Sequence, residues 1–328
     1  MTAELQVFNA NNGVTEGVWR DGDVITKRLR RHAPGASAEW RPSENPRSWI
    51  YWRREAYAYE TDLPKRLGLH GPQLIRSEAT DATATLTLEA FNGRTAADLT
   101  LPDLEQLAAD LGHSQGRDRL PSDPWLSRGF LRDYSTTRVT DFSLFDRDDV
   151  WPDERVKADL LHLHANRERL LAILEALPRT VCHLDVFPNN VFATNAGIGL
   201  IDWSFTGDGA VGEDVGNLIP DSVFDLQFAA SELSMLEQCL PIAYLGGLKR
   251  AGWTGDDRLV MLAIHASAVK YDWLAPRVIA RALANTAHEG YGGVTVNAAE
   301  LLAARWTGLA LIGRWARLAL SDADRLRL

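Results

Sequence analysis

Residues 180–203 read TVCHLDVFPNNVFATNAGIGLIDW, and this stretch decides the fold. Two short apolar runs, at 191–193 and 198–201, flank the turn-forming residues 194–197, which is the pattern of a β-hairpin. Polar residues stand just before the first run and just after the second. Because a hairpin returns the chain to the end from which it started, the sequence predicts that these polar residues lie close together.

Three of these polar residues suit one kind of chemistry. Asp185 and Asn190 share one loop, and Asp202 follows the hairpin. Phosphoryl transfer needs a carboxylate that orients and deprotonates an attacking hydroxyl, and oxygen ligands that hold Mg²⁺ against nucleotide phosphates. The set predicts one carboxylate beside an acceptor hydroxyl, with an amide oxygen and a second carboxylate facing the metal. The loop residues alone also fit a plainer interpretation, in which they only cap a turn.

The strings HLDVFPNN and LIDW resemble the catalytic loop and the metal-binding segment of the aminoglycoside phosphotransferase family, relatives of choline kinases and protein kinases. The resemblance implies a bilobal protein-kinase-like fold. It implies Asp185 as catalytic base, Asn190 and Asp202 as Mg²⁺ ligands, and His183 as the organiser of the catalytic loop. The ordinary pKa of histidine also suits His183 to general base catalysis, but the resemblance gives that role to Asp185.

The resemblance extends over most of the chain. Lys27, in VITKRL, matches the strand lysine that contacts nucleotide phosphates, and Glu55 matches the helix glutamate that pairs with it. Glu89 and Phe91 fall at the hinge where the purine of ATP or GTP docks. Asp214, in GEDVGNL, resembles an acid that supports the catalytic loop from the following helix.

Two features depart from the family pattern. No GxGxxG loop precedes Lys27, and only residues 11–13 and Gly17 are available for a turn that covers phosphates. The segment that leads to the paired glutamate is long, so Glu60 competes with Glu55. Glu55 is preferred because it lies one helical turn before a tyrosine on the predicted inward face.

Residues 1–91 predict a small antiparallel sheet with one helix. The segments 23–29 and 83–91 alternate β-branched and apolar residues, as strands do. Trp49, Trp52, Ala56 and Tyr59 recur at intervals of three and four, which predicts a helix over residues 47–60. The Pro-, Ser- and Gly-rich residues 32–48 are expected to form a loop.

After a turn-prone connector at 92–95 the pattern becomes helical. Regularly spaced Leu and Ala predict helices at 102–112, 153–177 and 225–251. We therefore predict an α+β fold with two parts: a nucleotide-binding lobe over residues 1–91, and a helical lobe over 92–328 that holds the catalytic loop and the acceptor site.

The composition excludes several classes of protein. The chain has 328 residues, 45% of them hydrophobic, which suits an ordinary globular protein large enough for two lobes. A formal net charge of -9 argues against a nucleic-acid partner, because phosphate backbones require clustered Lys and Arg. No apolar run reaches the roughly 18 to 20 residues of a membrane span, so no membrane partner is expected.

The two cysteines, Cys182 and Cys239, form neither a metal motif nor a disulfide framework, and the N-terminal residues do not resemble a secretory signal. These features predict a reducing, cytoplasmic setting. Cys182 is interpreted as a small buried residue rather than a nucleophile.

Two further features leave alternatives open. The acidic stretch 141–154, with Asp146, Asp148, Asp149 and Asp153, is either a solvated loop or a surface that attracts a cationic substrate. The predicted C-terminal helices carry the tryptophans 273, 306 and 315, which belong either to the core or to an acceptor pocket.

The predicted activity is therefore transfer of the γ-phosphate of ATP or GTP to a hydroxyl of a small molecule, with Mg²⁺. The expected acceptor is an antibiotic, as in a resistance enzyme. A sugar, an amino alcohol or a nucleoside is the alternative within the same class. A catalytically silent kinase-like binding protein is the alternative from another class. The sequence does not specify the acceptor hydroxyl, the purine or the oligomeric state.

Overall fold

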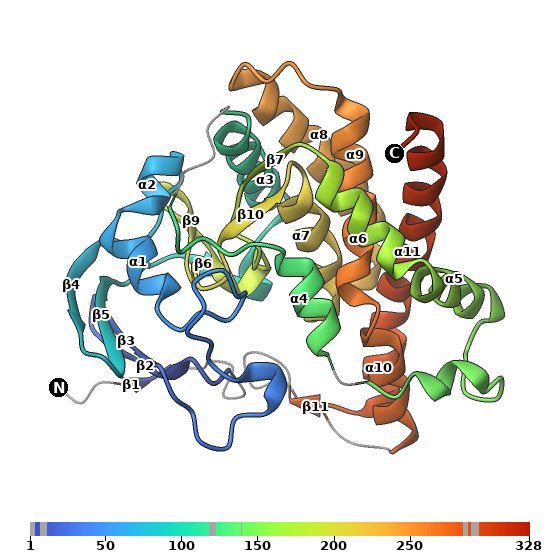
Figure 1. The fold of residues 1–328 in the computed structure, drawn as a ribbon, viewed down its shortest axis with the longest axis horizontal. Helices are drawn as coiled ribbons and strands as arrows, with labels where there is room; N and C mark the ends of the chain where they lie inside the picture. The colour runs from blue at the N-terminus through green and yellow to red at the C-terminus, as the bar shows by residue number, and fades with distance from the viewer. Residues whose placement is uncertain (1–3, 7–11, 118–122, 139, 285–287, 290–294) are drawn as a thin grey trace.

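A computed structural model describes residues 4–6, 12–117, 123–138, 140–284, 288–289 and 295–328. The β-sheet that begins the chain lies at one end of the molecule, and most helices gather at the other end, with the C-terminus in the last helix (Figure 1). The predicted α+β fold, with an N-terminal antiparallel sheet and a helix-rich remainder, is confirmed.

The sheet has five antiparallel strands in the order β1-β2-β3-β5-β4. Its strands are β1 (Glu4–Leu5), β2 (Thr15–Asp21), β3 (Val24–Arg30), β4 (Leu74–Ala79) and β5 (Thr83–Glu89). Strands β3 and β5 pair in register, with Lys27 opposite Leu86. Both of these side chains are buried on the same face, because side chains of a strand alternate between its two faces. The register therefore turns Lys27 inward.

The helix predicted over residues 47–60 is shorter than expected. Helix α1 spans Arg54–Glu60, and α2 (Leu63–Leu67) follows it. Trp49 and Trp52 are buried as predicted, but they lie in the turns before α1. The spacing of Trp49, Trp52, Ala56 and Tyr59 by three and four residues thus indicates a continuous buried apolar surface, of which only the last part is helical. The prediction of one helix from residue 47 is wrong.

The long helical predictions also change at their ends. The predicted helix 153–177 is two helices, α5 (Glu154–Ala165) and α6 (Arg167–Ala176), divided at Asn166. Of the residues 225–251 predicted as helix, only those from Leu233 onward form the helix α8 (Leu233–Arg250). The longer helices are α3 (Leu101–Gln115), α4 (Phe130–Thr137), α5 (Glu154–Ala165), α6 (Arg167–Ala176), α7 (Glu213–Phe224), α8 (Leu233–Arg250), α9 (Asp257–Ala266), α10 (Leu274–Leu283) and α11 (Ala298–Leu326). The 3₁₀ helices are η1 (Ala38–Trp40), η2 (Ala96–Asp98), η3 (Phe142–Asp146), η4 (Pro188–Asn190), η5 (Ala230–Glu232) and η6 (Ser267–Tyr271).

The predicted hairpin forms within the helical part of the chain. Strands β8 (Val191–Thr194) and β9 (Gly197–Leu200) pair antiparallel, and β6 (Arg94–Thr95) joins them. A second small ladder pairs β7 (Arg179–Cys182) with β10 (Gly207–Ala210). The chain runs from β7 through the catalytic loop and the hairpin to β10, which pairs with β7. This pairing fixes the two ends of the segment between these strands. Strands β11 (His288–Glu289) and β12 (Thr295–Val296) pair elsewhere.

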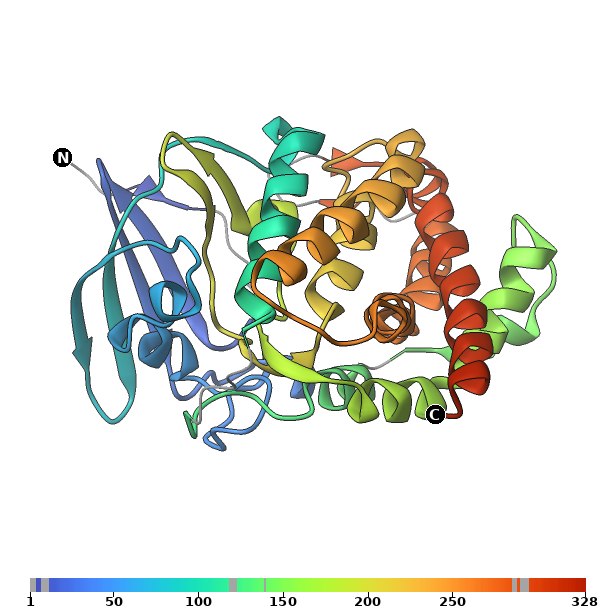
Figure 2. The same cartoon turned by 90° about the horizontal axis from the view of Figure 1, so that it is seen from above.

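Helices α3 and α8 lie side by side in the helical part of the chain (Figure 2). Gly112 of α3 faces the Tyr244 carbonyl of α8, and a Cβ added at Gly112 would lie 2.1 Å from that oxygen. Gly247 of α8 faces the Ala109 carbonyl in the same way, also at 2.1 Å. The two backbones therefore touch, and only glycine fits at these two positions.

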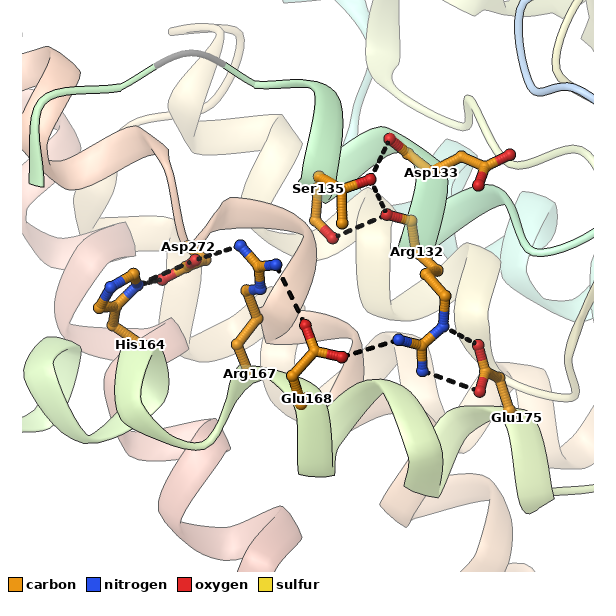
Figure 3. Close-up of polar contacts among 9 residues, drawn as sticks. Arg132, Asp133, Ser135, His164, Arg167, Glu168, Glu175 and Asp272 are labelled. Atoms are coloured by element: carbon orange, nitrogen blue, oxygen red, sulfur yellow. Dashed lines mark hydrogen bonds and ion pairs between the residues drawn. The ribbon is translucent and has the colours of Figure 1, made fainter.

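A network of ion pairs joins α4, the junction of α5 and α6, and the start of α10 (Figure 3). Arg132 of α4 contacts Glu175 and Glu168, each at 2.7 Å. Asp272, just before α10, lies 2.9 Å from the His164 ring and 3.9 Å from Arg167. Networks of this kind hold the orientation of helices more firmly than isolated surface pairs. This network thus fixes α4 and α10, which both border the cavity described below.

Within the part of the chain that the structure describes, no helix combines the length and the apolar character needed to cross a bilayer.

We predict that Gly247→Ala lowers the free energy of unfolding by about 1–3 kcal/mol, because the new methyl group forces α3 and α8 apart. The neighbouring Gly246→Ala is the matched control, since a Cβ there meets only the end of the Arg250 side chain at 3.6 Å. That control is expected to be neutral or to stabilise the helix by up to about 1 kcal/mol. Urea unfolding of both variants tests the close contact, and equal stabilities would contradict it.

Candidate active site

One cavity of about 1020 Å³ lies between the sheet and the helices. Its sheet half is lined by residues of β2, β3 and β5 and by the segment after β5. Its helical half is lined by residues of α4, α7, η6, α10 and α11 and by the linkers at their ends. The catalytic loop and the end of β9 lie between the two halves. The predicted site residues that line this cavity are Lys27, Glu55, Glu89, Phe91, Asp185, Asn190 and Asp202. His183, the remaining predicted site residue, is not part of the lining.

Lys27 lies between two carboxylates at the border of the sheet half. Its Nζ is 2.7 Å from Glu55 Oε2 and 3.1 Å from Asp202 Oδ1. Glu60 is exposed and accepts a hydrogen bond from Ser77, so Glu55 is the residue that the structure pairs with the lysine. The strand, the helix α1 and the end of the hairpin thus meet at one ammonium group.

The charges of this cluster depend on one another. Burial by itself lowers the pKa of Lys27, but the charges of Asp202 and Glu55 outweigh it and raise that pKa above its ordinary value. Burial raises the pKa of Glu55 to about 7, against the pull of the Lys27 ammonium. Burial by itself would raise the pKa of Asp202 as well, but the Lys27 charge outweighs it and holds that pKa below its ordinary value. The ammonium therefore favours the charged form of both carboxylates: Asp202 is ionised at neutral pH, whereas Glu55 is only partly ionised.

Arg54, next to Glu55 in α1, is fully buried, and its hydrogen bonds go to backbone carbonyl oxygens. Its guanidinium donates to five carbonyl groups, at distances of 2.5–3.1 Å, from Pro46, Ser48, Trp49, Trp125 and Ser204. Burial lowers the pKa of Arg54 to about 9. One side chain thus ties α1 to the loop before it and to the segment that follows Asp202.

Asp214, at the start of α7, holds the catalytic loop through its backbone. Its two carboxylate oxygens accept hydrogen bonds from the amides of His183 and Leu184 at 2.9 and 2.8 Å. Gln115 donates to the same carboxylate at 2.7 Å. Leu184 has a left-handed backbone, with φ of 68°, which branched or bulky residues adopt at a cost of about 1 kcal/mol or more. The buried acid therefore supports the loop, as the resemblance implied.

His183 supports the loop from its side-chain end. Its Nε2 donates to the Ile201 carbonyl at 3.0 Å, and its Nδ1 accepts from the Asp185 amide at 3.3 Å. The ring also packs edge-on against the buried Trp203. Burial lowers the pKa of His183, which suits a neutral ring with its proton on Nε2. These contacts connect the two ends of the hairpin.

Asp185 is half-buried between the two halves of the cavity. The Asn190 amide donates to the Asp185 carbonyl at 2.9 Å and to its Oδ2 at 3.1 Å. Burial raises the pKa of Asp185 to about 8, and the negative charge of Asp202 acts in the same direction. A carboxyl with this pKa is suited to take up a proton near neutral pH.

Asp202 follows β9, and its backbone is left-handed, with φ of 60°. The amide of the preceding Ile201 donates to the Asn190 carbonyl at 3.0 Å, so the two predicted metal ligands are joined through the backbone. Non-glycine residues in this conformation are concentrated at functional sites, where neighbouring contacts hold them in place.

The sheet half contains the predicted hinge. Glu89 ends β5, and Phe91 packs against Phe192 of the hairpin and against His70. The apolar side chains that line this half include those of Ile25, Leu88, Phe91, Phe192 and Ile201. Of the residues considered for a turn over phosphates, Asn12 lines the cavity, whereas Asn11 lies outside the described residues.

Sequence reasoning missed most of the helical half. Lys270 forms a buried ion pair with Asp221 at 2.9 Å, and Arg305 is buried beside the end of α7. The local signal for both cations is a single positive charge in an apolar helical run, and that pattern alone does not distinguish a site from a structural ion pair. Of the three tryptophans considered, Trp273 lines the cavity and Trp315 is in the core.

The acidic stretch 141–154 does not contribute to the cavity lining. Asp148 pairs with Lys157, Asp149 pairs with Arg147, and Asp153 caps the start of α5. This agrees with the interpretation of the stretch as a solvated segment.

Glu213, beside Asp214, provides a test of how α7 is anchored. It is buried, it accepts a hydrogen bond from the Ala210 amide at 2.8 Å, and burial raises its pKa from 4.5 to about 7. Because the pKa is higher in the folded state, the folded protein binds more protons than the unfolded chain does between pH 4.5 and about 7. The contribution of Glu213 to the free energy of unfolding is therefore full at low pH and decreases as pH rises from 4.5 to about 7.

We predict that Glu213→Gln removes this dependence. The difference in unfolding free energy between the wild type and the variant is expected to fall by up to about 3 kcal/mol across the window. Urea unfolding at pH 4.5 to 8 measures it, with Glu154→Gln on the exposed start of α5 as the control. A difference that stays constant with pH would show that Glu213 titrates as it does in the unfolded chain.

Comparisons with known proteins agree with this geometry. The family model described as "Phosphotransferase enzyme family" matches residues 52–241. A choline/ethanolamine kinase family protein from Mesorhizobium loti superposes with a TM-score of 0.54 at 15% identity, over 96% of this chain and 93% of that one. An aminoglycoside phosphotransferase from Alicyclobacillus acidocaldarius gives a TM-score of 0.51 at 17% identity, over 98% and 92%. A search of curated proteins found no match.

The identities to the two solved structures are low, so these neighbours establish the fold, which is the bilobal protein-kinase-like one predicted from the sequence. The family match spans more than half of the 328 residues. The chain therefore belongs to the phosphotransferase enzyme family and is a kinase that acts on a hydroxyl of a small molecule.

Proposed function

We propose that this kinase transfers the γ-phosphate of ATP or GTP to its acceptor, with Asp185 as the base and with Asn190 and Asp202 as ligands of Mg²⁺. One observation carries the proposal. Asp185, Asn190 and Asp202 border a single cavity, and Asp202 is also bound to the lysine that the sheet turns inward. A turn-capping role for these residues does not require such a cavity.

The nucleotide is assigned to the sheet half, which residues 1–91 mostly form. The apolar side chains of Ile25, Leu88 and Phe91 suit a purine ring, and Glu89 stands at the edge where the ring would meet the hinge. Lys27 is placed to steady the phosphates, since Asp202 and Glu55 hold its ammonium in position.

The side chains present fit a magnesium ion. Among the described residues, no three His, Cys, Asp or Glu side chains gather as a complete metal cage. Mg²⁺ does not need one, because it usually takes one or two protein oxygens and completes its shell with phosphate oxygens and water. Asn190 donates through its amide nitrogen to Asp185, which leaves its oxygen for a metal. Bound there with Asp202, Mg²⁺ would neutralise phosphate charge.

The reaction then follows from the position of Asp185. The acceptor hydroxyl oxygen forms a bond to the γ-phosphorus as the bond between that phosphorus and the β–γ bridging oxygen breaks. The hydroxyl proton passes to Asp185, and the nucleoside diphosphate leaves. A metal held by Asp202 would compensate the charge of that carboxylate, and one cause of the raised pKa of Asp185 would then be removed.

The acceptor occupies the helical half in this proposal. An antibiotic remains the predicted acceptor from the sequence, and a metabolite alcohol the alternative; the two solved neighbours are named for an aminoglycoside and for choline or ethanolamine. A silent binding protein is the less favoured function, because the lysine, its glutamate, the base and both metal ligands are all present at one cavity. A cytoplasmic setting remains a prediction.

We predict that Asp185→Ala lowers turnover by about 10³-fold or more, because proton transfer loses its base. Binding of Mg²⁺-ATP is expected to stay within about threefold of the wild type, since Asp185 does not contact the nucleotide in this assignment. Nucleotide consumption over a panel of hydroxylated antibiotics, sugars and amino alcohols first identifies an acceptor. Wild-type turnover by the Asp185→Ala variant would exclude the residue as the base.

For Asp202→Ala we predict that binding of the Mg²⁺-nucleotide is weakened, whereas Asp185→Ala leaves it largely unchanged. This change removes a metal ligand, so the Mg²⁺ concentration needed for half-maximal nucleotide binding is expected to rise about tenfold or more. Thermal shift with ATP and with GTP, each titrated with Mg²⁺, measures it and also reveals the preferred purine. A wild-type protein that responds to neither nucleotide would favour the silent binding protein.

A further inference from the structure

Lys270 brings a second buried ammonium group to the cavity. It belongs to η6, it lines the helical half, and its side chain is only 6% exposed. Its Nζ donates to Asp221 Oδ2 of α7 at 2.9 Å and lies 5.3 Å from the ring centre of Tyr271. Among the described residues, the lysines that line the cavity are Lys27, on the sheet side, and Lys270. Each half of the cavity thus contributes one ammonium group.

The Lys270 side chain is charged and has donors to spare. Burial by itself lowers the pKa of Lys270, but the charge of Asp221 outweighs it and raises that pKa above its ordinary value. An ammonium group has three N–H donors. One of them binds Asp221, and no other hydrogen bond of Lys270 is found within the part of the chain that the structure describes. The remaining donors can therefore bind a ligand in the cavity.

Asp185 lies between the two ammonium groups. Lys27 is bound to Asp202 at the border of the sheet half, and the catalytic loop with Asp185 lies between the halves. Burial and the charge of Asp202 raise the pKa of Asp185, and the charge of Lys270 opposes them. The charged groups therefore follow one another across the cavity in the order Lys27, Asp202, Asp185 and Lys270.

This order matters for a phosphoryl group held beside the base. The γ-phosphoryl group carries negative charge on its three outer oxygens during transfer. Lys27 and a metal on Asn190 and Asp202 would meet it from the nucleotide side, whereas Asp185 brings a carboxylate to the acceptor side. Like charges repel strongly in surroundings of low dielectric. A cation beside Asp185 compensates this repulsion, and Lys270 is placed to supply it.

We propose that Lys270 is a catalytic residue whose ammonium contacts an outer oxygen of the γ-phosphoryl group from the helical half, opposite Lys27. This rests on the proposed phosphotransferase function, which puts the γ-phosphate beside Asp185. Lys270 keeps its proton while the acceptor oxygen bonds to the γ-phosphorus and the β–γ bridging oxygen leaves. Asp221 is a positioning residue, because it holds the ammonium at the cavity wall.

The plainer role of this ion pair is to join η6 to α7. In that case neither partner contacts the nucleotide, and loss of either one affects all nucleotides alike. A contact with the γ-phosphate affects only nucleotides that have one. The difference between a nucleoside triphosphate and a diphosphate therefore distinguishes the two roles without an identified acceptor.

Paired nucleotides measure this difference on the full chain. Calorimetry gives the Kd of Mg²⁺-ADP and of Mg²⁺-AMP-PNP, a non-hydrolysable ATP analogue, with GDP and GMP-PNP in their place if the protein prefers guanine. We expect Lys270→Met to weaken AMP-PNP binding about tenfold or more, because a hydrogen bond between charged groups is lost. Binding of ADP is expected to stay within about twofold of the wild type.

Variants of the partner residue separate the contact from the ion pair. Asp221→Asn removes the carboxylate charge but keeps an oxygen that accepts from Lys270, so both Kd values are expected to stay within about threefold. Lys270→Met combined with Asp221→Asn leaves no unpaired buried charge, so it serves if Lys270→Met alone folds poorly. Compared with Asp221→Asn, the double variant is expected to lose affinity for AMP-PNP only. Lys249→Met, at an exposed lysine of α8, is the matched control.

Two results overturn the proposal: an unchanged ratio of the two Kd values when Lys270 is replaced, or an equal loss of affinity for both nucleotides. These results are distinct from a failure of the proposed function. If the wild type binds neither AMP-PNP nor GMP-PNP with Mg²⁺, the nucleotide-dependent function itself fails. If it binds one of them and the ratio stays constant in the variants, only the role of Lys270 is wrong.

Discussion

The structure depends on one buried ammonium group. Lys27 binds Glu55 of α1 and Asp202 at the end of the hairpin, so a strand, a helix and a loop from distant parts of the chain meet at a single charge. Leaving a buried charge without its partner costs roughly 3–5 kcal/mol, so the three elements keep their relative positions. Asp202 is shared in this way between the sheet and the predicted metal, which links the position of the phosphates to that of the catalytic loop.

Residues that hold the site are largely separate from residues that face the cavity. Asp214, which accepts a hydrogen bond from Gln115, binds the backbone amides of the catalytic loop, and the His183 ring joins that loop to the Ile201 carbonyl. Asp185 and Asn190 are thereby left with their side chains toward the cavity. This division explains how a loop with a left-handed residue, Leu184, keeps one conformation: its amide is fixed by a buried carboxylate rather than by a neighbouring strand.

Much of the fold and of the central site could be predicted from sequence because the signals are local. The hairpin follows from its apolar runs and turn, and Lys27 follows from its resemblance to the strand lysine of the aminoglycoside phosphotransferase family. The start of α1 could not be predicted, because Trp49 and Trp52 are buried by tertiary contacts that mimic helical spacing. The helical half was missed because Arg138, Lys270 and Arg305 come from separate elements, and only folding brings them to one cavity. The roles of the site residues remain proposals.

Arg54 bears on whether the two lobes are independent. Three of the carbonyl groups that it binds come from residues 46–49, but the other two, of Trp125 and Ser204, come from the helical part of the chain. A fragment limited to residues 1–91 would lack those two acceptors, so the Arg54 guanidinium would keep only three of its five carbonyl partners. The native position of α1, and with it that of Glu55, therefore depends on contacts with the helical part of the chain as well as on contacts with the loop before α1.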